Sequence, residues 1–149
     1  MNSKYLILIL FFIGSVLGSM NIAVAASLIS AKEASLPPVA GVLATRGISR
    51  GPSVKMASPE PDVAVSSPLD FKVIFEARGG EKIDLSSVKV IYMKSPFVDL
   101  TPRLKNAISA NGIDFPKAEV PPGSHTIRIT VKDTEGRETN SVQTLVVNK

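Results

Sequence analysis

The single histidine is the residue of this chain best suited to proton transfer or to binding a metal. His125 follows the turn Pro121-Pro122-Gly123 and opens an extended run in which it has the same parity as Ile127. A neutral imidazole can serve as a general base or a metal ligand. A histidine without an assigned nucleophile or acid is weak evidence for catalysis. The position also suits a corner residue that points inward and hydrogen-bonds backbone across a loop, and we favour this structural interpretation.

Acidic residues near turns raise the question of a calcium site. Asp133 and Glu135 lie in one turn, and Asp99 and Asp114 are further candidates. Calcium takes six to eight oxygen ligands, several of them from one loop. Asp and Gly are expected in a tight turn for conformational reasons alone, so the pattern predicts a turn rather than a metal site. Pairing of Arg103 or Arg137 with these acids would be structural. The candidate binding residues are Asp99, Arg103, His125, Asp133 and Arg137.

Other catalytic signatures are missing from the sequence. The chain has no Cys and no Trp, and we find no phosphate-binding glycine loop, nucleophile elbow or metal-spaced cluster. We therefore predict a protein that is not an enzyme and that has no cofactor, no catalytic residue and no metal ligand. With no disulfide to help, stability must come from the core.

The first 25 residues are typical of an export signal. Lys4 provides the positive end, an apolar run extends from Tyr5 to Val16, and Ala23-Val24-Ala25 fits a cleavage site before Ala26. The alternative is an uncleaved anchor, because residues 5–25 are long enough to span a bilayer. Either form predicts export to the periplasm or surface of a bacterium, with membrane contact only through an uncleaved leader. The remaining chain has a small positive charge, which does not indicate nucleic-acid binding.

Residues 26–51 are interrupted repeatedly by Ser, Pro and Gly, and we interpret them as a flexible linker. Residues 52–149 then form the domain. Alternation marks strands at 69–76, where Ile74 breaks the outward polarity, and at 125–133, which opens a hairpin whose second strand ends at Val147. A proline-flanked run at 53–57 predicts an edge strand.

The middle of the domain is less regular. Residues 83–87 look like a connection into a strand at 88–94, and Asn111-Gly112 predicts a hairpin between 103–110 and 112–119, although Leu104, Ala107 and Ile108 also have helical spacing. About seven short strands without a long helix predict an all-β antiparallel sandwich. Ile74, Ile91 and Met93 fall on nominally wet faces, where a loop or the linker covers them or a partner does.

The run Gly123 to Asp133, followed by Glu135-Gly136-Arg137 and a closing strand, resembles exported immunoglobulin-like and fibronectin-type-III-like domains of bacteria. Ile83 to Val90 looks like the usual entry into a middle strand of such domains. The likeness covers about two thirds of the chain. It implies an immunoglobulin-like fold and little about function, because that fold has many roles. Sandwich-type periplasmic copper carriers also resemble the chain, but they use an N-terminal His and clustered Met, whereas Met56 and Met93 are isolated here.

We therefore expect a non-catalytic binding module that docks an envelope protein or polysaccharide. The candidate contact regions are the loop 96–103, the turn 134–137 and the edge strand 53–57, since loops and open edges carry most binding functions. A copper carrier and a spacer without a ligand are the alternatives.

Overall fold

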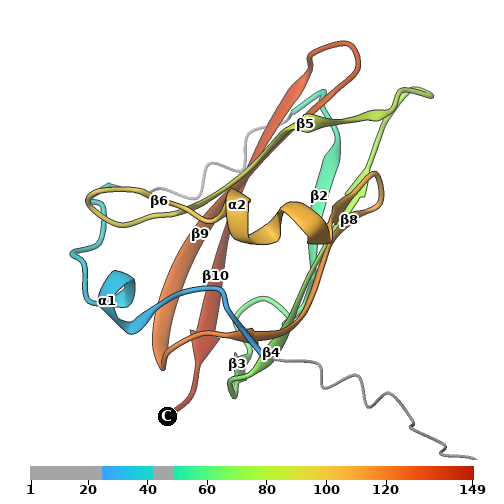
Figure 1. Ribbon diagram of the computed structural model, residues 1–149. Helices are drawn as coiled ribbons and strands as arrows, with labels where there is room; N and C mark the ends of the chain where they lie inside the picture. Colours follow the sequence, from blue (N-terminus) through green and yellow to red (C-terminus); the bar gives the residue numbers. More distant parts are fainter. Residues whose placement is uncertain (1–24, 42–48) are drawn as a thin grey trace, which may run out of the picture.

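The computed structural model describes residues 25–41 and 49–149. The expected leader therefore lies almost entirely outside the described residues, as does the 42–48 part of the expected linker. The described chain forms two β-sheets packed face to face (Figure 1). Ten strands occur in this part of the chain, of which six have six or more residues and four have two. The predicted all-β sandwich is confirmed.

The first sheet has the order β1-β8-β4-β2, and β7 also pairs with β8. Its strands are β1 (Ala26–Ser27), β2 (Ser53–Ser58), β4 (Leu69–Glu76), β7 (Ile108–Ser109) and β8 (Gly112–Glu119). Among the described strands, β2 pairs with β4 alone, so it is the edge strand that the sequence predicts.

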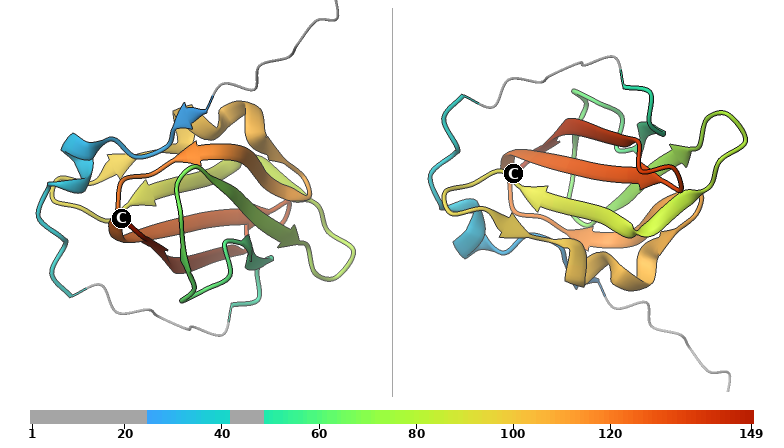
Figure 2. Two further views of the ribbon diagram at one scale, coloured as in Figure 1. Left: turned by 90° about the horizontal axis from the view of Figure 1, so that it is seen from below. Right: turned by 90° about the horizontal axis from the view of Figure 1, so that it is seen from above.

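The second sheet has the order β3-β10-β9-β5-β6. Its strands are β3 (Ala64–Val65), β5 (Ile83–Tyr92), β6 (Val98–Asp99), β9 (Gly123–Asp133) and β10 (Glu138–Val147). The long strands pair antiparallel as expected, whereas the short β1 and β3 pair parallel with β8 and β10. Figure 2 shows the two sheets as separate layers.

The core fills the space between the sheets and follows the predicted alternation. In β4 every second residue from Leu69 is buried, and in β9 the buried residues run from His125 to Asp133 at the same spacing. Phe71, Ile129 and Tyr92 have no exposed surface. The two inward faces thus provide the apolar burial that holds the sandwich together.

Residues 26–41 are not the flexible linker that the sequence suggests. Leu28 is completely buried and Ile29 nearly so, and β1 continues the first sheet beside β8. Helix α1 (Ala31–Ala34) follows, and Pro38 then bridges to Lys94, two residues after the end of β5. The segment crosses one end of the sandwich (Figure 1, blue). Its Ser and Pro residues interrupt the sequence pattern, but the adjacent Leu28 and Ile29 provide enough apolar surface to dock it.

The same segment covers part of the apolar outer surface. The Val39 amide donates to the Met93 carbonyl, and the Met93 side chain is buried. Cover by the linker, one of the two explanations for Met93, is thus correct. Ile74 remains exposed on the outer face of β4.

The predicted strand at 103–110 is wrong over most of its length. Helix α2 (Thr101–Leu104) and a 3₁₀ turn η1 (Lys105–Ala107) precede the two-residue β7. Pro102 suits the first helical turn, where no amide donor is needed, and Leu104 is buried. The hairpin into β8 is confirmed. Gly112 is required there, because a Cβ would lie 1.8 Å from the Val73 carbonyl oxygen.

Candidate functional site

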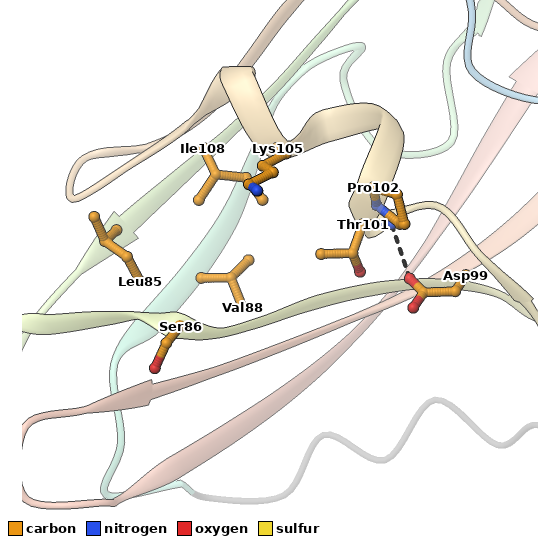
Figure 3. A pocket seen from close by; sticks show the side chains of 8 residues that line it. All are labelled: Leu85, Ser86, Val88, Asp99, Thr101, Pro102, Lys105 and Ile108. Carbon is orange, nitrogen blue, oxygen red and sulfur yellow. Dashed lines mark hydrogen bonds between the residues drawn. The ribbon is translucent and has the colours of Figure 1, made fainter.

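An open groove lies where β5 runs beside α2, along one side of the sandwich (Figure 3). Its volume is about 640 Å³. The side chains lining it come from β5, from the β6–α2 corner and from the η1–β7 region. They are Leu85, Ser86, Val88, Asp99, Thr101, Pro102, Lys105 and Ile108. Four of these eight residues are apolar, so the groove can accept an apolar group beside the Lys105 ammonium.

A bulge in β5 presents Leu85 to the groove. The pairing of β5 with β9 shifts between Asp84 and Lys89, so residues 85–88 are out of register. The Ser86 amide and hydroxyl both donate to Asp84 Oδ1, at 3.0 and 2.6 Å. Ser87 Oγ accepts from the Lys132 amide at 2.8 Å, which ties the bulge to β9. Bulges commonly re-aim a side chain, and here Leu85 is left 48% exposed.

The opposite wall is fixed to β5 by hydrogen bonds. Thr101 Oγ1 accepts from the Val90 amide at 2.9 Å, and the Thr101 amide donates to Asp99 Oδ1 at 2.9 Å (Figure 3). The Leu100 amide donates to the Val90 carbonyl, also at 2.9 Å. Leu100 and Leu104 are completely buried beneath this corner. The groove is therefore preformed between two anchored walls.

Of the five candidate binding residues, only Asp99 lines the groove. Arg103, in helix α2, instead binds the N-terminal segment. Its Nη1 donates to the Leu28 carbonyl at 2.7 Å, and its two Nη atoms contact the two carboxylate oxygens of Glu33 at 2.9 and 2.5 Å. The hydrogen bonds from Arg103 lower the pKa of Glu33 from 4.5 to about 2. Ser30 and Glu33 also cap α1 reciprocally.

His125 points inward, as its parity predicts, and uses both ring nitrogens. Nδ1 lies 2.8 Å from the Tyr92 hydroxyl, and Nε2 lies 2.7 Å from the Pro121 carbonyl oxygen. Because a carbonyl can only accept, Nε2 donates and Nδ1 accepts from Tyr92 in the neutral ring. Burial lowers the pKa of His125. Burial, followed by the Glu33 charge, raises the pKa of Tyr92 to about 12. These contacts are those of a structural corner.

Asp133 and Arg137 organise the turn between β9 and β10. Asp133 is buried, and its carboxylate accepts from the amides of Glu135 and Arg137 and from Arg137 Nε, the last at 2.7 Å. Burial acts to raise the pKa of Asp133, but the hydrogen bonds from Arg137 outweigh it and the pKa is lowered. The turn lies at the opposite end of β9 from His125, so the candidate residues do not converge on one site.

Residues 25–41 and 49–149 offer few side chains that could bind a metal ion together. No three His, Cys, Asp or Glu residues there are grouped as metal ligands would be. Met56 lies in β2 of the first sheet, whereas Met93 follows β5 of the second.

None of the helices in the described ranges is both long and apolar enough to cross a membrane.

The residues that the sequence reasoning missed are Leu85, Lys105 and Ile108. Residues 83–87 look like a connection because Asp84, Ser86 and Ser87 break the strand alternation. Those residues in fact make the bulge, and Asp followed two residues later by Ser is the local signal of such a turn. Lys105 and Ile108 reach the groove because α2 and η1 form where the sequence predicts a continuous strand.

Comparison of the chain with protein-family models, with curated proteins and with solved structures finds no match. The fold alone therefore gives the class of the protein, an all-β sandwich of two sheets.

Proposed function

We propose that this protein is a non-catalytic, exported binding module of the bacterial envelope, and that it docks a protein partner through the β5–α2 groove. The observation that carries the proposal is Leu85, an exposed leucine held over an apolar groove by the hydrogen bonds of a bulge. Holding an exposed apolar side chain in one place is typical of a contact surface.

The groove favours a protein over a polysaccharide. Leu85, Val88, Pro102 and Ile108 form an apolar lining, and no aromatic side chain is among the residues that line it. Sugar polymers usually need stacking rings and many polar groups, whereas an apolar side chain of a protein fills such a groove directly. Lys105 at the rim adds a contact for an acidic residue of the partner.

The strand pairing supports the immunoglobulin-like interpretation of the sandwich. Strands β2, β4 and β8 form one sheet and β5, β9 and β10 the other, which corresponds to the A, B, E and C, F, G strands of that fold. Such sandwiches often bind through loops and edges at their periphery. The groove, beside the 96–103 loop, is in such a place.

Photo-crosslinking in cells tests the proposal. A photoreactive residue replaces Leu85 in one variant and Val63 in a control, because Val63 is 47% exposed but lies outside the groove. We expect position 85 to form a discrete protein adduct that position 63 does not form. Leu85→Asp should abolish capture of the same partner from envelope extract, whereas Val63→Asp should retain it.

Three results would contradict the proposal. Equal adducts at both positions would show that the groove is not the contact surface. An adduct that polysaccharide hydrolases remove would assign the surface to a polymer. The absence of any adduct, with both variants exported and folded, would leave a spacer without a ligand.

A further inference from the structure

A second hollow lies on the outer face of the β3-β10-β9-β5-β6 sheet, away from the β5–α2 groove. Its volume is about 860 Å³. One wall is the end of the N-terminal segment at residues 39–41. The rest is Met93 and Phe97 beside β5, Arg128 and Thr130 of β9, and Glu138, Asn140 and Val142 of β10. Phe97 is 56% exposed, so the hollow has one apolar side that solvent can reach.

Arg128 has an incomplete environment. It lies in the middle of the sheet, with Ile91 of β5 on one side and Val142 of β10 on the other. Neither of these two apolar side chains can accept a hydrogen bond from the Arg128 guanidinium. The Arg128 Nε atom is buried and has no hydrogen-bond partner among the described residues. Within the same ranges its only directed side-chain contact is with the Phe97 ring, whose centroid lies 5.6 Å from Cζ.

A buried guanidinium donor without an acceptor is unfavourable, because its lost hydration is not replaced. Arginine also presents a planar fork that matches a carboxylate. A ligand that brings a carboxylate to Arg128 would therefore supply the missing acceptor.

The acidic residue described on this face, Glu138, has other partners and does not pair with Arg128. Glu138 lines the hollow, but Lys132 lies 3.4 Å from its carboxylate and Asn140 Nδ2 donates to it at 2.7 Å. Hydrogen bonds from Asn140 and Lys132 lower the pKa of Glu138, consistent with a carboxylate that already has partners. Lys89 adds a third cation to the same face through its pairing with Thr130.

We propose that this hollow binds a carboxylate attached to an apolar group. The carboxylate lies against the Arg128 guanidinium, and the apolar group packs on Phe97 and Val142. A peptide C-terminus with an apolar last residue and a medium-chain fatty acid both have this chemistry. The site is independent of the β5–α2 groove, so either proposal stands if the other fails.

Nuclear magnetic resonance titration of the purified protein with small probes tests the site. The first probe is N-acetyl-leucine and its control is N-acetyl-leucinamide, which keeps the apolar group but lacks the charge. We expect the acid to shift the amide signals of Met93, Phe97, Arg128 and Val142, and to bind at least about tenfold more tightly than the amide. A parallel titration with octanoate identifies the source, since the tighter of the two acids has the better-fitting apolar part.

Two variants complete the test. Arg128→Gln should weaken binding of the acids by about tenfold or more, whereas Lys89→Gln, on the same face but outside the lining, should change it less than about threefold. Both side chains project from the outer face, and one-dimensional spectra verify the fold. The proposal is overturned if acid and amide bind equally, if neither acid shifts these signals, or if the two variants lose the same affinity.

Discussion

Arg103 and Glu33 form a clasp that we expect to stabilise the whole sandwich. The pair joins α2 to the N-terminal segment, and the same guanidinium holds the Leu28 carbonyl. Glu33→Gln removes the charge but keeps a residue that can complete the capping box with Ser30. This variant therefore isolates the charge of the clasp from the cap of α1.

The magnitude follows from the pKa of Glu33. A fall from 4.5 to about 2 corresponds to about 3 kcal/mol if all of it appears as stability. The side chains of Arg103 and Glu33 are 35% and 18% exposed, so solvent screening reduces this value. We expect Glu33→Gln to lower the free energy of unfolding by about 1–2 kcal/mol at pH 7.

The direction of the Glu33 pKa shift determines how the stability changes with pH. Because the folded protein holds the Glu33 pKa below its ordinary value, the stabilisation is complete above about pH 4.5 and is lost as the pH falls toward 2. Urea unfolding, followed by circular dichroism at pH 7, 4.5 and 3, measures it. A double-mutant cycle with Arg103→Gln isolates the pair. A coupling energy near zero at pH 7, or one that is unchanged at pH 3, would refute the reasoning.

Two further predictions concern His125 and the apolar core. Since the folded protein lowers the pKa of His125, stability should fall as the pH drops below about 6.5, the ordinary value. Urea unfolding at pH 8 and pH 5 should show a smaller decrease in His125→Gln than in the unmodified protein, and an equal decrease would assign the pH dependence elsewhere. Ile129→Ala and Phe71→Ala should each cost about 2–5 kcal/mol because both side chains are completely buried; near-neutral values in urea unfolding would show that the core packs differently.

The sandwich was predictable because its long strands alternate cleanly. In β4 and β9, inward residues that are mostly apolar alternate with outward residues that are mostly polar. A pattern with a period of two allows only one face of the strand to point inward. The inward position of His125 follows from the same parity. The Asp133 to Gly136 turn follows from local chemistry alone, because the Asp133 carboxylate accepts from amides two and four residues later.

The α2 corner and the N-terminal segment were not predictable in this way. Each is short, and each takes its structure from contacts distant in sequence. Arg103 meets Glu33 across 70 residues, and Lys94 Nζ donates to the Ala34 carbonyl across 60. Periodicity over a few residues cannot detect such partners, since tertiary contacts override local propensity. Lys105 and Ile108 were missed with the α2 corner and Leu85 with the β5 bulge, whereas Asp99 was among the candidate residues.

Helix α2 links the N-terminal segment to the groove. Thr101, Pro102 and Lys105 line the groove on one side of this turn, while Arg103 reaches the Leu28 carbonyl and Glu33 on another. A domain that began at residue 52, as the sequence suggests, would lose Leu28 and Ile29 from the core and leave Arg103 without its acceptors. The α2 wall would then keep its hydrogen bonds to Val90 but lose those that join Arg103 to the N-terminal segment. The segment that follows the expected cleavage site is therefore part of the sandwich domain, and it supports the proposed contact surface without lining it.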